Sequence, residues 1–151
     1  MKYTLEILIK SPRAEVIKKL DNIDNIKHWQ RGLVSIEHMS GIPGQVGAKM
    51  KLSYKFGKRQ MDLIETITKR DFPDEFDATY ETKDMFNYQQ NIFKETPEGY
   101  TKWISHSEFI PSSLILRIMA FLMPGAFKKQ SKKYLEDFKD FVETGNSVAE
   151  Q

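Results

Sequence analysis

Glu65 is the ionisable residue best placed for proton chemistry in this sequence. It shares one face of a predicted strand with Met61, Leu63 and Ile67, because alternate side chains of a strand point the same way. A carboxyl group on an apolar face has a raised pKa and can serve as an acid or a base. Tyr54, on the preceding strand, is the second candidate proton carrier. The alternative is that Glu65 lies at a strand end near water or pairs with a lysine.

The sequence contains no motif for the other catalytic chemistries that we considered. His28, His38 and His106 show no metal-ligand spacing, and the chain has no cysteine, so we expect no metal and no cofactor. The nucleophile pattern G-x-S-x-G is absent from the sequence. Residues 41–49, GIPGQVGAK, lack the phosphate-loop pattern and join two predicted strands, which indicates a tight turn.

Alternating positions of several strands form a candidate ligand pocket. Methionines and phenols give such a wall adaptable apolar surface with a few polar groups. The alternative is that the same side chains pack on the terminal helix and leave no space. The predicted pocket residues are Met50, Leu52, Tyr54, Met61, Leu63, Tyr80, Gln89, Trp103, Phe127 and Tyr134.

The stretch DMFNYQQNIF, residues 84–93, places amides on one face of a predicted strand, at Asn87, Gln89 and Asn91. Ser105 and Ser107 of the last strand are in phase with Trp103. If these faces point inward, hydrogen-bonding groups line one end of the cavity. The alternative is that a β-bulge changes the phase, which would place the amides in solvent.

The elements that position these residues follow from hydrophobic periodicity. A strand from Tyr3 to Ile9 precedes two short helices, and six strands follow with short connections, which favours antiparallel pairing. The expected ranges are helices at 14–20 and 26–30, strands at 33–39, 46–56, 61–67, 76–80, 85–94 and 100–109, and a long helix at 126–144. We expect one domain over 1–145 and a disordered tail over 146–151.

Within residues 112–123, the stretch from Leu114 to Met123 is apolar on every side except at Arg117. The segment is too short and interrupted to span a bilayer, which requires about 20 apolar residues, although an interfacial membrane contact stays open. We expect a helical lid over the cavity, with Pro124-Gly125 as its hinge. The alternative is a dimer contact. The predicted lid residues are Leu114, Ile118, Phe121 and Leu122.

Composition limits the class of protein. The chain has 151 residues and a net charge of +2 from 23 basic and 21 acidic residues. This length suits one domain, and the charge balance argues against a nucleic-acid binder. The N-terminus lacks an apolar signal region, and with no cysteine we expect a cytoplasmic protein.

Five stretches resemble, in order, the SRPBCC (START-like) superfamily, especially its polyketide cyclase/dehydrase and lipid-transport branch. They are IKSPRAEVIKKLDNIDNIKHW, SGIPGQVGAKM, ITKRDFPDEF, GYTKW and FKKQSKKYLEDFKDFVE. The resemblance covers about residues 1–144 and implies an α+β helix-grip fold. In that fold a curved seven-stranded antiparallel sheet wraps around a long C-terminal helix, with two short helices after the first strand. It also implies a cavity for a hydrophobic ligand, but no universal catalytic motif.

We therefore predict a domain that binds a small hydrophobic or amphipathic molecule, as a carrier or sensor. One alternative is a cyclase or dehydratase that acts on a bound polyketide-like or aromatic substrate. A second alternative is an interaction module that docks a protein or membrane through 112–123. The expected partners are a small hydrophobic ligand, with peripheral membrane contact open, and no nucleic acid; the oligomeric state is left as monomer or homodimer.

Overall fold

The computed structural model describes residues 1–149. Seven strands form one antiparallel sheet in the order β1-β7-β6-β5-β4-β3-β2. Short connections join successive strands from β2 to β7, so neighbours in sequence pair in space. The strands are β1 (Lys2–Ile9), β2 (Leu33–Ser40), β3 (Lys49–Phe56), β4 (Arg59–Asp71), β5 (Glu75–Glu81), β6 (Met85–Glu95) and β7 (Thr101–Pro111).

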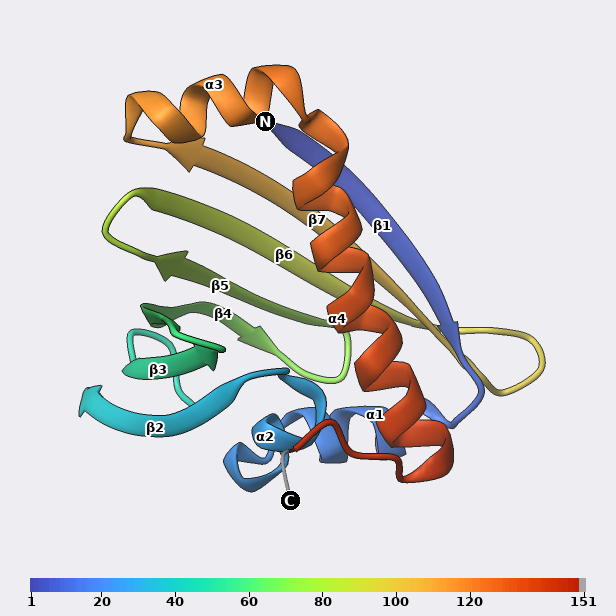
Figure 1. Ribbon diagram of the computed structural model, residues 1–151. Coiled ribbons are helices and arrows are strands. Elements are labelled where there is room, and N and C mark those ends of the chain that lie inside the picture. Colours follow the sequence, from blue (N-terminus) through green and yellow to red (C-terminus); the bar gives the residue numbers. More distant parts are fainter. Residues whose placement is uncertain (150–151) are drawn as a thin grey trace.

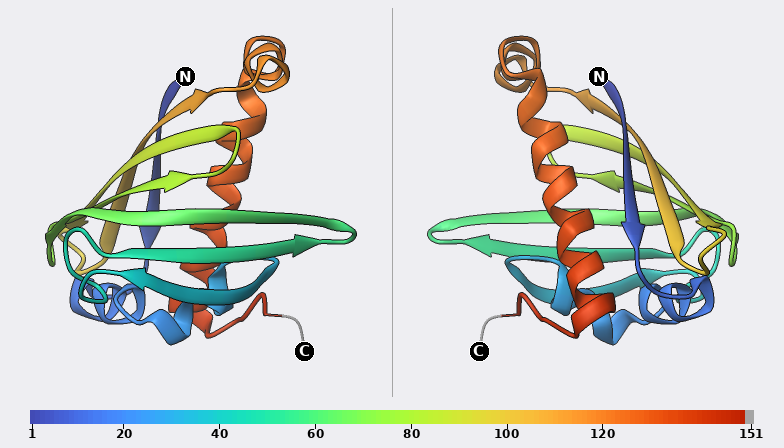
Figure 2. Two further views of the ribbon diagram at one scale, coloured as in Figure 1. Left: turned by 90° about the vertical axis from the view of Figure 1, so that its left-hand side faces the viewer. Right: turned by 90° about the vertical axis from the view of Figure 1, so that its right-hand side faces the viewer.

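The helices lie at the ends and on the concave face of this sheet (Figure 1). α4 crosses the concave face, and α3 lies across its N-terminal end at a sharp angle; Figure 2 shows α3 end-on above the sheet. Gly145 ends α4 with φ of 76°, a conformation that glycine adopts without steric cost. The helices are α1 (Arg13–Leu20), η1 (Ile23–Asn25), α2 (Ile26–Trp29), α3 (Leu114–Leu122) and α4 (Pro124–Thr144).

This arrangement confirms the predicted helix-grip fold, and the two largest differences in strand limits are at the start of β3 and the end of β4. The strand expected from Val46 begins at Lys49, because Gly44 and Gly47 have positive φ and keep Val46 in an exposed turn. β4 continues four residues beyond the predicted Ile67, through a register shift between Ile67 and Lys69. Such a bulge bends the strand and so contributes to the curvature of the sheet.

The hydrophobic core fills the end of the molecule where α4 finishes. Phe138 is fully buried, and its ring meets Trp29 and Trp103 edge-on at centroid distances of 5.0 and 5.2 Å. We call this cluster the closed end. It comprises Leu5, Ile9, Val16, Phe93, Trp103, Leu135, Phe138 and Val142.

Polar contacts also fix α4 at the closed end. Asp137 is buried and accepts two hydrogen bonds from the Arg31 guanidinium, at 2.7 and 3.1 Å. The residues after α4 run beside α2, where the backbone N–H of Val148 donates to the carbonyl of His28. Of the tail predicted to be disordered, residues 150 and 151 lie outside the described residues.

Candidate functional site

A cavity of about 1350 Å³ lies between the concave face of the sheet, the first half of α4 and the inner side of α3. We call this part of the molecule the open end. All ten residues predicted for the pocket lie on the cavity wall: Met50, Leu52, Tyr54, Met61, Leu63, Tyr80, Gln89, Trp103, Phe127 and Tyr134. The alternative of a filled interior is therefore wrong for this half of the molecule.

The amides of β6 point into the cavity. The β6 register runs without a shift against both β5 and β7, so no bulge turns the amides to solvent. Asn91 Oδ1 accepts from Trp103 Nε1 at 3.0 Å, and Gln89 Nε2 donates to Asn87 Oδ1 at 3.1 Å. Ser105 is buried beside them. This part of the wall is thus a polar band within an otherwise apolar cavity.

Glu65 lies inside the cavity and not at a strand end. It faces Tyr80 across the β4–β5 pair, and burial raises the pKa of its carboxyl group, which the hydrogen bond to Tyr80 partly opposes. Burial also raises the pKa of Tyr80, and the neighbouring Glu65 charge adds to the shift. The two groups therefore form a buried acid pair that stays protonated to higher pH than either group alone in water.

Tyr54 is held by a contact to the helical region after β1. Its hydroxyl donates to Gln30 Oε1 at 3.0 Å, and burial raises the pKa of the phenol, with smaller contributions from Tyr134 and Glu65. Tyr54 is therefore a neutral hydrogen-bonding group on the cavity wall, oriented by Gln30.

Trp29 adds a polar group that the sequence pattern did not single out for the pocket. Its ring lines the cavity, and its Nε1 is the one buried side-chain polar atom of residues 1–149 without a hydrogen-bond partner. A buried donor without a partner costs about 1–3 kcal/mol. An acceptor supplied by a bound molecule would satisfy it.

α3 borders the mouth of the cavity. Its inner side contributes Leu116 and Met119 to the wall, and Met123 follows at the junction with α4. The four predicted lid residues lie instead on the exposed side of α3: Leu114, Ile118, Phe121 and Leu122. Movement of α3 stays a prediction.

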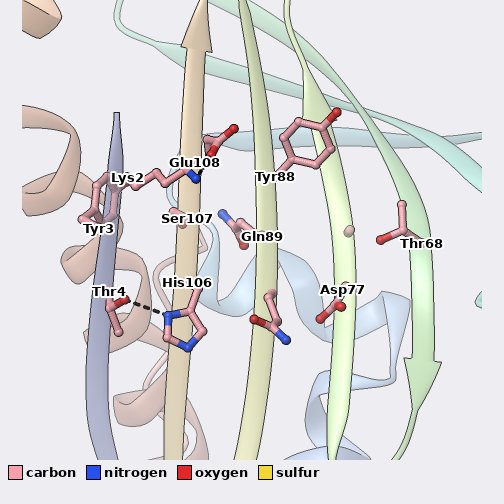
Figure 3. Close-up of a pocket in the computed structure, with 12 residues that line it drawn as sticks. Lys2, Tyr3, Thr4, Thr68, Asp77, Tyr88, Gln89, His106, Ser107 and Glu108 are labelled. Atoms are coloured by element: carbon pink, nitrogen blue, oxygen red, sulfur yellow. Dashed lines mark hydrogen bonds and ion pairs between the residues drawn. The ribbon is translucent and has the colours of Figure 1, made fainter.

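A shallower depression of about 500 Å³ lies over strands β1, β7, β6, β5 and β4, where outward side chains gather (Figure 3). Thr4 Oγ1 and His106 Nδ1 are 2.7 Å apart, which places His106 on the outer face as predicted. Gln90 and Asp77 continue this row across β6 and β5, where Asp77 pairs in register with Gln90 and Gln90 with His106. The depression carries a polar row on the outer face of the sheet, whereas the cavity lies on the concave face.

Asp77 and Glu75 form a carboxyl pair that our sequence reasoning missed. Burial, and then the hydrogen bond to Glu75, raise the pKa of Asp77 to about 7. The pKa of Glu75 is lowered by the same hydrogen bond. Their i, i+2 spacing on one strand was the available signal, because such residues share a face. Among residues 1–149, no group of three or more acidic or histidine side chains is arranged to hold a metal.

Comparison with known proteins supports the fold only. No protein-family profile and no curated protein matches this chain. Among solved structures, Ara h 8.0201 is 13% identical with a TM-score of 0.73, covering 94% of this chain and 97% of its own. An uncharacterised protein from Rhizobium leguminosarum is 13% identical with a TM-score of 0.78, covering 95% and 94%.

A protein of unknown function from Staphylococcus aureus is also 13% identical, with a TM-score of 0.78, and the match covers 96% of this chain and 94% of that one. Each match spans nearly the whole of both chains, so the similarity extends to the complete arrangement of sheet and helices. At these identities, the similarity shows that the chain has the helix-grip fold.

Proposed function

We propose that this domain binds a small amphipathic molecule in its cavity and acts as a carrier or sensor, as in the lipid-transport branch that the sequence resembles. The cavity volume of about 1350 Å³ is the observation that carries this proposal. Small-molecule sites usually enclose about 300–1000 Å³, so this cavity offers room for a ligand of lipid size.

The cavity wall favours a ligand with both an apolar and a polar part. Leu52, Met61 and Leu63 line one region, whereas Asn87 and Asn91 line another. Purely apolar ligands would leave the polar band without additional partners. A molecule with a hydrogen-bond acceptor would also match the free Nε1–H of Trp29. These observations favour an amphipathic ligand over a hydrocarbon.

Native mass spectrometry of freshly purified protein tests the proposal directly. We expect a defined additional mass that is lost on denaturation, and displacement of a fluorescent fatty-acid probe by the extracted compound. The matched pair Leu63→Trp and Ile64→Trp locates the site, because Leu63 lines the cavity and Ile64 is the next residue on the opposite face. Leu63→Trp should fill the cavity and abolish probe binding, whereas Ile64→Trp should leave it unchanged.

Two results would contradict a binding role. One is a purified protein that carries no added mass and takes up no apolar probe. The other is equal probe binding by the two tryptophan variants, which would place the probe outside the cavity.

An enzyme is the second candidate, and the buried pair of Glu65 and Tyr80 is the observation that favours it. A buried carboxyl group whose pKa is raised can donate a proton to a bound carbonyl or hydroxyl group, as a cyclase or dehydratase requires. Turnover of the bound compound that disappears in Glu65→Gln, with probe binding retained, would support this candidate. Full turnover in Glu65→Gln and Tyr54→Phe would remove both residues from the chemistry.

A further inference from the structure

Several strongly exposed apolar side chains gather on α3. Phe121 is 85% exposed, Leu114 and Ile115 are each 72% exposed, and Leu122 is 69% exposed. α3 contains no buried residue. Soluble monomers seldom leave a contiguous apolar patch without a partner, so the outer side of α3 marks an interaction site.

α3 is held at the cavity mouth by few contacts. Ser113 caps it by accepting from the N–H of Leu116, and Arg117 Nε donates to the carbonyl of Pro111. Helices shorter than about 12–15 residues are marginally stable in water when isolated, and α3 has 9. A surface that covers its outer side would therefore stabilise the helix.

The charge around α3 points to the nature of that surface. Between residues 109 and 135 the chain carries five basic residues and no acidic one, although the whole chain is nearly balanced. Lys128, Lys129 and Lys132 are exposed on the part of α4 that directly follows α3, and none forms an ion pair within residues 1–149. Lys133 forms an ion pair with Asp137, with Nζ 3.4 Å from Oδ1.

We propose that α3 and the first turns of α4 dock on an anionic lipid bilayer. The outer side chains of α3 would enter the boundary between headgroups and acyl chains, and Lys128, Lys129 and Lys132 would contact the anionic headgroups. A second copy of this chain fits less well, because a two-fold interface would bring the same basic residues together.

This docking surface is next to the cavity mouth. Leu116 and Met119 line the cavity from the inner side of the helix whose outer side carries Phe121 and Leu122. Docking would therefore bring the mouth to the membrane, where a lipid-like ligand could enter without crossing water. This last step rests on the proposed ligand binding, whereas docking itself does not.

Vesicle flotation with the full chain tests the docking. We expect the protein to float with vesicles of phosphatidylglycerol and phosphatidylcholine, and to stay behind with phosphatidylcholine alone. Binding should weaken when NaCl is raised from about 0.1 to 0.5 M, because the Debye length falls well below 10 Å.

Two variants and two matched controls assign the surface. Phe121→Asp should weaken vesicle binding roughly tenfold or more. Lys128→Glu/Lys129→Glu should weaken it by at least about 25-fold, since each of the two basic residues contributes about fivefold. The control for the first is Ile42→Asp, at a side chain 73% exposed in the β2–β3 turn. The control for the second is Lys18→Glu/Lys27→Glu, which changes the net charge equally at the opposite end of the molecule. Both controls should bind like the wild type.

Absence of flotation for the wild type would overturn the proposal, as would equal losses in variants and controls. Sedimentation that shows a stable dimer, dissociated by Phe121→Asp, would assign the surface to a second copy instead. The fluorescent fatty-acid probe separates this question from the proposed function. Vesicle binding without probe uptake would refute the proposed ligand binding and leave the docking proposal standing. Probe uptake without vesicle binding would refute the docking proposal and leave the ligand binding standing.

Discussion

At the closed end, α4 presents Leu135, Phe138 and Val142 to a filled core, whereas at the open end Phe127 and Tyr134 of the same helix face a cavity of about 1350 Å³. One apolar stripe runs along the whole helix, so the difference comes from the sheet opposite. Phe93 and Trp103 pack in the closed end, and the same two residues form the cavity wall next to it. At the open end β6 contributes Asn87, Gln89 and Asn91 to the cavity wall, and β7 contributes Ser105.

The comparison shows that one end of α4 mainly stabilises the fold, whereas the other end leaves space that can bind a ligand. Tight packing, two aromatic contacts and the Arg31–Asp137 ion pair hold the closed end. The open end is packed less tightly, which leaves space for a ligand. Substitutions that remove equal volume from the two ends should therefore have unequal costs.

Phe138→Ala should have the largest effect on stability. Removing a fully buried aromatic ring from a filled core costs about 3–5 kcal/mol of unfolding free energy. Phe127→Ala is its matched control in the same helix, and should cost only about 1–2 kcal/mol, because a half-buried ring beside an existing cavity creates little new void. Urea denaturation of both variants measures the difference, and equal losses would mean that the open end is packed as tightly as the closed end.

The sequence predicts the two ends unequally well. Strict alternation over Met50, Leu52, Tyr54, Met61 and Leu63 determines which side chains face inward, because a shift of one residue would expose them all. Whether the inward side chains fill the space depends on the distance between sheet and helix. Strand curvature affects that distance, and periodicity does not predict features that bend a strand, such as the register shift between Ile67 and Lys69.

α3 shows a second limit of pattern reasoning. Its residues are apolar on nearly every side, so the sequence gives no phase to decide that Leu116 and Met119 face the cavity while Phe121 faces out. Arg31 and Asp137 show a third limit. They are 106 residues apart in the sequence and meet only in the folded chain, so no local sequence pattern predicts the pair.

Asp137→Asn should have the next largest effect. It weakens two charge-assisted hydrogen bonds from Arg31, and bonds of this kind contribute about 1.5–3 kcal/mol each. Because the Arg31 side chain is half exposed and can be rehydrated, we expect a total loss of about 1–3 kcal/mol. The control is Lys102→Met, which breaks an exposed pair with Glu6 and should cost less than about 0.5 kcal/mol. Similar losses in the two variants would refute the special role of the Arg31 contact.

Glu65→Gln should change the pH dependence of stability at the open end. Burial raises the pKa of Glu65 in the folded protein, so above its unfolded pKa of about 4.3 the unfolded chain loses this proton first. The carboxyl group therefore makes the protein less stable as pH rises from there through the folded pKa. The glutamine variant should lose less stability than the wild type over this range.

Thermal melts of both proteins from pH 4 to 8, without added ligand, measure this difference. Asp77→Asn is measured in parallel, because the pKa of Asp77 is also raised, to about 7. Ionisation of Asp77 should therefore also lower the stability of the protein as pH rises. The two sites lie on opposite faces of the sheet, so their effects should add in the double variant. A melting temperature that follows pH identically in Glu65→Gln and the wild type would place the Glu65 carboxyl group in water.

Phe121→Asp should have the smallest effect on stability, although it replaces a large apolar side chain with a charged one. The ring is 85% exposed, so the folded and unfolded chains hydrate the aspartate almost equally. We expect the unfolding free energy to change by less than about 0.5 kcal/mol. Urea denaturation at two protein concentrations measures this, because a dimer held by α3 would lose stability on dilution. A loss above about 1 kcal/mol would show that Phe121 is covered in solution, and the contrast with Phe138 would then reflect assembly and not only the interior of one chain.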